Sequence, residues 1–90
     1  MSEETREIRL KRLKIRAWRR GLKEMDLLMG GFADTEMASL SDADLDAFEA
    51  VMEEADQDLL RWVTGVEPVP EEHAEMLARI CARDTENTPQ

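Results

Sequence analysis

Apolar residues recur at helical spacing along almost the whole chain, and this periodicity constrains the fold more than any other feature. No stretch of the 90 residues alternates apolar and polar side chains, tyrosine is absent, and β-branched residues are few. Strands require that alternation, whereas spacings of three and four residues place apolar side chains on one helix face. A chain of this length has room for one core. The sequence therefore predicts an all-α single domain, a small bundle of about five helices.

Capping residues and glycines define the first two predicted helices. The first begins after a cap at Ser2 and ends near Arg19, because a serine hydroxyl satisfies free amides at a helix start. Gly21 interrupts the pattern, and a second, almost entirely apolar helix follows. The pair Gly30 and Gly31 is expected to weaken the end of that helix, since glycine is a poor helix former.

Three further segments complete the predicted bundle. Ser41 and Asp44 form a capping-box pattern at the start of the third helix, Asp56 is a cap for the fourth, Gly65 ends it, and Pro70 suits the first turn of the last. The sizeable apolar faces predict one core around Leu28, Phe48, Trp62 and Leu77. We expect an ordered core over about residues 5–84 and a flexible polar tail over residues 85–90.

Charge is divided unevenly along the chain. Residues 1–23 carry nine of the twelve Lys and Arg with three acidic residues, a local charge of +6, whereas the remainder carries three basic and eighteen acidic residues, a charge of −15. A phosphate backbone would be attracted to the first segment and repelled by the rest, while a protein surface can offer patches of both signs. This division favours a protein partner over nucleic acid.

The basic residues of the first helix form a stripe. Arg9, Arg12, Arg16 and Arg19 fall on one arc at spacings of three and four residues, and we expect this face to be exposed to solvent or to a partner. Such a stripe is also the electrostatic signature of nucleic-acid binding. Aromatic residues do not interleave with the stripe for base stacking, and the sequence has no recognisable recognition-helix pattern, which weakens that alternative.

The sequence places its two residues with catalytic potential, His73 and Cys81, where a catalytic role is not expected. His73 and Cys81 share an apolar arc of the last predicted helix with Met76, Leu77 and Ile80, which favours structural roles for both. The acidic runs lack the ligand spacing and central glycine of a calcium-binding loop, and no phosphate-cradling glycine loop is present. The sequence predicts neither an enzyme nor a protein with its own metal or cofactor. The absence of a long apolar segment predicts a cytoplasmic chain without membrane insertion.

The junction between the first two helices contains the most informative residues. Gly21 can simply permit a turn, with Arg20 and Glu24 paired four residues apart. Alternatively, a glycine without a side chain lets the backbone of a partner approach, and the flanking Arg and Glu make charge-assisted hydrogen bonds to it. Spacing alone leaves both interpretations open.

A wider set of residues resembles a known family, the succinate dehydrogenase assembly factor SdhE family, over residues 8–84. The resemblance rests on Arg20-Gly21-x-x-Glu24 with Met25-Asp26, then Leu40-Ser41-Asp42, Phe48, Glu53, Asp56, Asp58-Leu59-Leu60, Trp62 and Gly65. The set is specific, although an RGxxE motif alone would be weak. The Gly30-Gly31 pair departs from the bulkier residues of that family.

The resemblance implies a small helical bundle that acts as an assembly chaperone without a reaction of its own. Members assist covalent attachment of FAD to the flavoprotein subunit of succinate dehydrogenase, and in some bacteria of fumarate reductase, so FAD belongs to the partner. Arg20, Gly21 and Glu24 would contact the partner. The neighbouring residues expected on the same surface are Arg16, Trp18, Arg19 and Asp26. We expect a monomer. The alternative is an antitoxin-like or nucleic-acid-binding regulator that uses the basic first helix.

Overall fold

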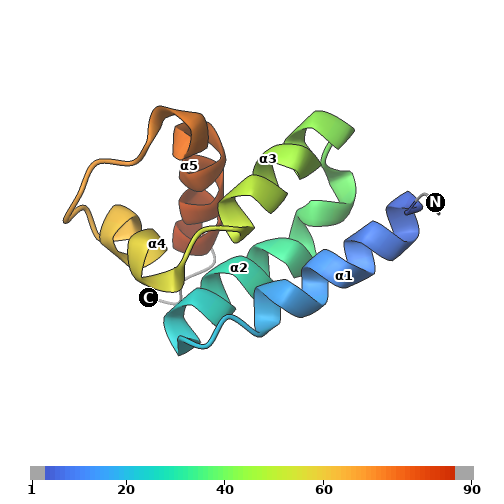
Figure 1. Ribbon diagram of the computed structural model, residues 1–90, viewed down its shortest axis with the longest axis horizontal. Coiled ribbons are helices and arrows are strands. Elements are labelled where there is room, and N and C mark those ends of the chain that lie inside the picture. Colours follow the sequence, from blue (N-terminus) through green and yellow to red (C-terminus); the bar gives the residue numbers. More distant parts are fainter. Residues whose placement is uncertain (1–3, 87–90) are drawn as a thin grey trace.

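A computed structural model describes residues 4–86 of the chain, and these residues form a compact arrangement of helices (Figure 1). In chain order the elements are α1 (Arg6–Trp18), α2 (Lys23–Thr35), the 3₁₀ helix η1 (Met37–Ser39), α3 (Asp42–Met52), α4 (Asp56–Val63) and α5 (Glu71–Glu86). The described part of the chain contains no strand. The all-α prediction with about five helices is confirmed.

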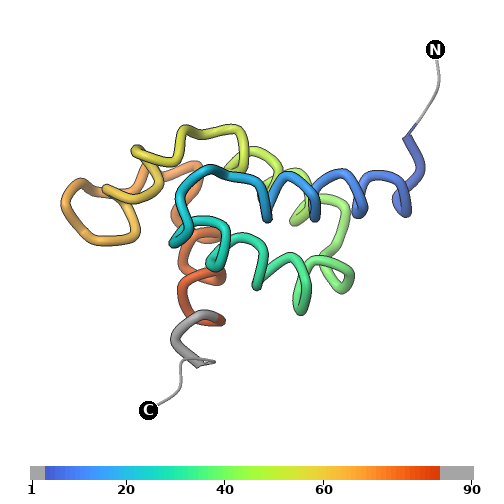
Figure 2. The backbone as a smooth tube through the Cα atoms, turned by 90° about the horizontal axis from the view of Figure 1, so that it is seen from below, coloured from blue at the N-terminus to red at the C-terminus, as the bar shows by residue number. Residues whose placement is uncertain are grey.

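The helices surround one core rather than forming a parallel stack. Helices α1 and α2 form an antiparallel hairpin, α3 lies beside α1, and α5 crosses α2 and α3 steeply (Figures 1 and 2). The α1–α2 turn lies close to the start of α4, so residues far apart in sequence meet there. None of the helices within residues 4–86 is long and apolar enough to cross a bilayer.

The core joins the inward faces of all five helices. The rings of Phe32 and Phe48 stack at a centroid distance of 5.3 Å and connect α2 to α3. Leu28, Phe48 and Leu77 are buried as predicted, whereas Trp62 is only half-buried at the edge of the core. Burial of apolar surface from five separate segments is what stabilises a small chain of this kind.

The caps differ from prediction at two helix starts. The predicted cap Ser2 lies outside the described residues, and the described α1 is capped by Thr5, whose hydroxyl accepts a hydrogen bond from the amide of Ile8. Helix α3 has the predicted Ser41 cap. At α4 the cap position is Ala55, and Asp56 is the first helical residue. Of the predicted tail, residues 85–86 continue α5, and residues 87–90 lie outside the described part.

Helix α2 continues through both glycines, so the expected weakening at Gly30 and Gly31 does not end it. The glycines instead make space for neighbouring side chains. A Cβ atom at Gly30 would lie 2.3 Å from the indole of Trp18, and one at Gly31 would lie 2.6 Å from the guanidinium of Arg83. Close packing from α1 and α5 therefore explains the pair, and these tertiary contacts outweigh the low helix propensity of glycine.

The two glycines are expected to respond differently to alanine. Gly30→Ala should lower the free energy of unfolding by about 1 to 2 kcal/mol, because the indole body of Trp18 must be displaced and overpacking outweighs the gain in helix propensity. Gly31→Ala should be neutral or stabilising by up to about 1 kcal/mol, since only the flexible end of Arg83 must move. Thermal melts and tryptophan emission test this, and equal destabilisation would contradict it.

The arginine stripe of α1 is not a free surface, because it pairs with acidic residues along α3, although the side chains of Arg12 and Arg16 remain 37% and 40% exposed. The ion pairs run along both helices in register: Arg6–Asp42 (2.8 Å), Arg9–Asp46 (2.7 Å), Arg9–Glu49 (2.9 Å), Arg12–Glu49 (3.0 Å) and Arg16–Glu53 (2.8 Å). We call this set the arginine–acid ladder. It neutralises the basic segment against the acidic body within the same molecule.

Glu49 lies at the centre of the ladder and links stability to pH. Hydrogen bonds from Arg12 and then Arg9 hold the pKa of this carboxyl below its ordinary value of 4.5. A lowered pKa in the folded state stabilises the fold above pH 4.5, and that contribution is lost as the pH falls through the folded-state pKa. Glu49→Gln should therefore cost about 1 to 2 kcal/mol at pH 7. Denaturant unfolding should show that the stability difference between the unchanged chain and Glu49→Gln becomes smaller below pH 4.5. A difference that does not change with pH would contradict the lowered pKa of Glu49.

Candidate partner-binding site

The turn between α1 and α2 depends on Gly21. Its φ of +109° is a conformation that side chains with a Cβ rarely adopt, and it turns the chain from the end of α1 to the start of α2. The nearest atom to a Cβ built there is Oδ2 of Asp56, at 3.7 Å. The glycine backbone is exposed. Another backbone can therefore approach this turn closely.

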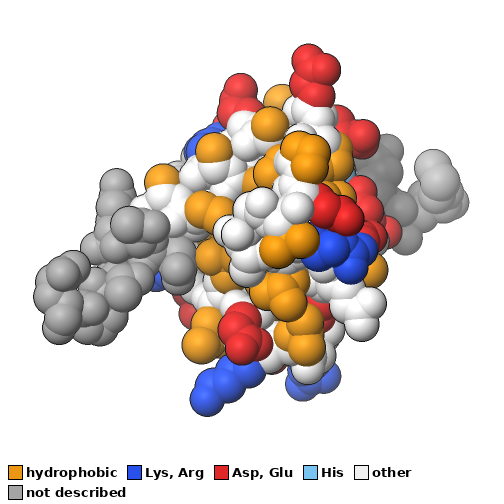
Figure 3. Space-filling view, turned by 90° about the vertical axis from the view of Figure 1, so that its left-hand side faces the viewer, with side chains coloured by type: hydrophobic (Ala, Val, Ile, Leu, Met, Phe, Trp, Pro, Cys, Tyr) orange, Lys and Arg blue, Asp and Glu red, His pale blue; other side chains and the backbone are white. Residues whose placement is uncertain are grey.

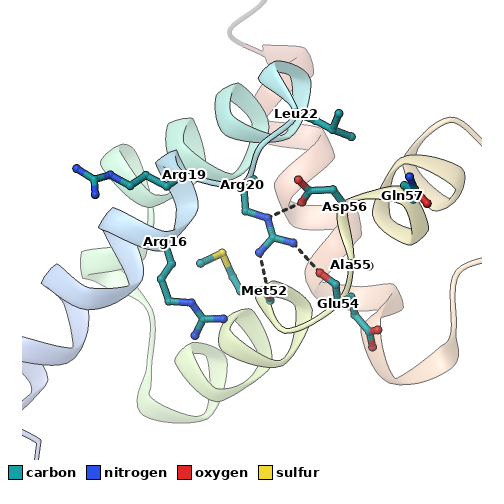
Figure 4. Close-up of a pocket in the computed structure, with 9 residues that line it drawn as sticks. All are labelled: Arg16, Arg19, Arg20, Leu22, Met52, Glu54, Ala55, Asp56 and Gln57. Atoms are coloured by element: carbon teal, nitrogen blue, oxygen red, sulfur yellow. Dashed lines mark hydrogen bonds and ion pairs between the residues drawn. The ribbon is translucent and has the colours of Figure 1, made fainter.

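Arg20 points inward and connects the turn to the segment between α3 and α4 (Figure 4). Its Nε donates to Asp56 Oδ1 (2.7 Å), Nη1 to the carbonyl oxygen of Met52 (2.5 Å), and Nη2 to that of Glu54 (2.6 Å). Only 8% of the side chain is exposed. The planar guanidinium thus satisfies two carbonyl groups that end α3 and neutralises the first carboxylate of α4.

Two further residues of the predicted site also bind within the chain. Asp26 accepts a hydrogen bond from the backbone amide of Arg20 (2.6 Å), which fixes the turn to the first turn of α2. Trp18 is 37% exposed, lies against Gly30, and donates from Nε1 to Asp34 (3.1 Å). These contacts make the junction rigid. Among the described residues no ion pair joins Arg20 to Glu24, so the helical pair of the simpler interpretation is not formed.

The outward-facing residues of the junction are Arg19, Gly21 and Glu24, all exposed. Arg16 lies beside them and pairs with Glu53 of α3. A hollow of about 450 Å³ opens beside the turn, and we call it the junction hollow. It is lined by Arg16, Arg19, Arg20, Leu22, Met52, Glu54, Ala55, Asp56 and Gln57 (Figure 4). Of the predicted site residues, Arg20 and Asp26 hold the turn through internal contacts, Arg16 and Arg19 line the hollow together with Arg20, and Gly21 and Glu24 lie outside its lining.

Sequence reasoning missed the second wall of the hollow. The segment Met52–Gln57 lies more than thirty positions from Arg20, and it was interpreted as the end of one helix and the cap of the next. A signal was available in Asp56, because an acidic residue at the start of a helix is also a partner for a buried arginine. Nothing in the local spacing indicated which arginine would reach it.

His73 is buried as expected. Its Nε2 lies 2.7 Å from Oε2 of Glu54, and its ring lies 5.8 Å from that of Trp62. The sequence predicted that Cys81 would lie on the buried face of the last helix, but the residue is only half-buried. Among the described residues no group of His, Cys, Asp and Glu could hold a metal ion. The histidine thus connects α5 to the same segment that Arg20 holds, which favours a structural role.

Comparison with known proteins identifies the family to which the chain is similar. Residues 11–84 match the family described as flavinator of succinate dehydrogenase. The FAD assembly factor SdhE of Acetobacter pasteurianus is 34% identical over 85 residues, which cover 94% of this chain and 78% of that protein. The mitochondrial succinate dehydrogenase assembly factor 2 of Mycosarcoma maydis is 40% identical over 67 residues, or 74% of this chain. The corresponding factor of Meyerozyma guilliermondii is 34% identical over 88 residues, or 93% of this chain.

The chain spans 28% of the length of the Mycosarcoma maydis protein and 65% of the Meyerozyma guilliermondii protein. The family match contains the whole Arg20-Gly21-x-x-Glu24 turn and all of α2, α3 and α4. It also contains the segment that Arg20 binds, so it covers both walls of the junction hollow. This protein belongs to the flavinator of succinate dehydrogenase family, as its resemblance to the SdhE assembly factors indicated.

Proposed function

We infer that this protein is an FAD assembly factor, which binds the flavoprotein subunit of succinate dehydrogenase and promotes its covalent flavinylation. The observation that carries the inference is the family match over residues 11–84, which includes the exposed turn at Gly21. The Acetobacter pasteurianus relative has the same role in its name and is similar over nearly the full length of this chain.

The predicted site residues have two different roles at the junction. Arg19, Gly21 and Glu24 contact the partner directly, and Arg16 adds charge at the rim of the hollow. Arg20 and Asp26 hold the turn through their internal contacts, and Trp18 packs the end of α1 against α2. A rigid turn loses little conformational freedom on binding, so more of the contact energy appears as affinity.

The mechanism that we propose is indirect. The new bond joins the flavin to a histidine of the flavoprotein subunit, so the assembly factor acts by favouring the partner conformation in which the two groups are well placed. A bias of about 1.4 kcal/mol changes the reactive population tenfold, and one charge-assisted hydrogen bond made only to that conformation can supply it.

The chain contributes binding rather than chemistry in this proposal. It is not an enzyme and carries no cofactor of its own, since FAD belongs to the partner. It acts in the cytoplasm as a monomer, and the fumarate reductase flavoprotein is a second partner. The antitoxin-like or nucleic-acid-binding alternative lacks support, because arginines that it would use are paired with acidic residues of α3 in the arginine–acid ladder.

Co-expression tests the proposed function directly. A flavoprotein subunit produced in cells without their own assembly factor should gain covalent flavin when this chain is supplied, measured as in-gel flavin fluorescence relative to total subunit. The same cells with an empty vector provide the control. Equal flavin fluorescence with and without the chain would overturn the proposal, and recovery of nucleic acid with the purified chain would favour the regulator.

A further inference from the structure

A second hollow lies next to the junction hollow, and Glu24 of the Arg20-Gly21-x-x-Glu24 motif forms part of its lining. It also measures about 450 Å³ and opens between α2, α4 and α5. Its lining is mostly apolar and consists of Glu24, Met25, Leu27, Leu28, Leu60, Val63, Thr64 and Cys81. Leu27 forms part of the lining, and 52% of its surface is exposed.

One face of α4 connects the two hollows. Gln57 lines the junction hollow, and Leu60, Val63 and Thr64 line the second. Spacings of three and four residues place these side chains in one row along the helix. Gln57 and Leu60 are only about 4.5 Å apart along the axis. The two hollows therefore lie next to each other along α4, and we call the pair the α2–α4 groove.

The two ends of the groove differ in chemistry. At the junction end, Arg19 and Lys23 are exposed, and neither forms an ion pair among the described residues. At the other end the lining is mostly apolar, and Glu24 is its one charged residue. In Figure 3 hydrophobic side chains occupy much of the face that is shown, with acidic and basic side chains interspersed among them. An occupant that matches the groove needs an acidic group at one end and an apolar group at the other.

We propose that the α2–α4 groove extends the docking surface and binds one segment of the flavoprotein subunit. This proposal rests on the proposed function and specifies the partner sequence that it requires. The segment places an acidic side chain near Arg19 and Lys23 and inserts an apolar side chain beside Leu27.

Leu27→Glu tests the apolar end without disturbing the core. Leucine and glutamate have similar helix propensities and the side chain is already half exposed, so the thermal melt should not change. We expect affinity for the purified flavoprotein subunit, measured by isothermal titration calorimetry, to fall at least tenfold. Leu27→Met keeps an apolar side chain of similar volume and should bind within about twofold of the unchanged chain.

Ile15→Glu is the matched control. Ile15 is 55% exposed, lies within α1, and does not line the groove, so its replacement should leave affinity within about twofold. An equal loss of affinity for Ile15→Glu and Leu27→Glu would overturn the proposal, because the effect would then follow added charge rather than the groove. Arg19→Glu should slow association in a salt-dependent manner if the acidic end of the segment is assigned correctly.

The outcomes separate this inference from the proposed function. If Gly21→Arg abolishes binding while Leu27→Glu binds normally, the groove proposal is wrong and the proposed function stands. If the unchanged chain fails to bind the subunit, the proposed function fails first. If Leu27→Glu instead converts a dimer to a monomer in sedimentation experiments and leaves subunit affinity unchanged, a second copy of this chain occupies the groove and the proposal is overturned.

Discussion

Replacing Gly21 with arginine is expected to reduce covalent flavin in the co-expressed flavoprotein subunit to the level seen without the assembly factor. A side chain at this position holds the backbone of the partner several ångströms away from the turn. We expect the whole contact between this turn and the partner to be lost, because residues at the centre of an interface dominate its affinity. In-gel flavin fluorescence measures the effect, and affinity for the subunit should fall together with it.

The positive φ of Gly21 requires a control for folding. Any residue with a Cβ is strained in this conformation, so Gly21→Arg should also lower the free energy of unfolding by about 1 to 2 kcal/mol. Gly21→Ala carries the same strain with a small side chain, and circular dichroism melts of both variants measure it. Loss of flavinylation in the arginine variant with partial retention in the alanine variant assigns the effect to blocked approach.

Glu24→Ala tests the charged part of the same surface. The side chain is exposed in the first turn of α2, so loss of its interaction with the helix dipole should cost no more than about 0.5 kcal/mol. Removal of the carboxylate leaves a donor of the partner unpaired in a buried contact, which costs about 1 to 3 kcal/mol of binding free energy. A folded Glu24→Ala chain that supports normal covalent flavin would exclude Glu24 from the contact.

Arg20→Ala is expected to lower the free energy of unfolding by about 3 to 5 kcal/mol, the largest stability loss predicted for a charged residue of this chain. It removes the partner of Asp56 and leaves the carbonyl groups of Met52 and Glu54 without their donor. An uncompensated charge in a nearly buried site is the costly result of breaking such a pair. Chemical denaturation at pH 7 measures the loss.

Arg19→Ala is the matched control for Arg20, since the two arginines are adjacent and only Arg20 points inward. Arg19 is exposed, and its removal should change stability by no more than about 0.5 kcal/mol. The same substitution should weaken binding of the flavoprotein subunit. If Arg20→Ala proves as stable as Arg19→Ala, Arg20 is not the residue that holds the turn to the segment between α3 and α4.

Much of the fold could be predicted because its signals are local. Apolar spacing identified five helices, Ser41 was correctly assigned as a cap, and the inward placement of Phe48 and Leu77 followed from periodicity. Each of these features depends on residues within one or two helical turns. Sequence reasoning could therefore evaluate them without knowing which helices meet.

The missed features depend on contacts between distant segments. Gly30 was interpreted through helix propensity, but its role depends on the indole of Trp18 from another helix. The stripe of α1 was interpreted as a free surface because the acidic row of α3 lies about forty residues away. Arg20 likewise reaches Asp56 across the fold. Charge and volume are visible in a sequence, whereas the pairing of one segment with another is set by tertiary packing.

The arginine–acid ladder has a consequence for work with fragments of this protein. Its basic row lies in residues 6–16 and its acidic row in residues 42–53. A peptide that ends before α3 therefore lacks every acidic residue of the ladder. A peptide of residues 1–23 has a charge of +6, whereas the whole chain has a charge of −9. Such a peptide would behave as a polycation and adhere to nucleic acids. That binding would be a property of the isolated peptide and not of the intact molecule, in which the arginines of the ladder are paired.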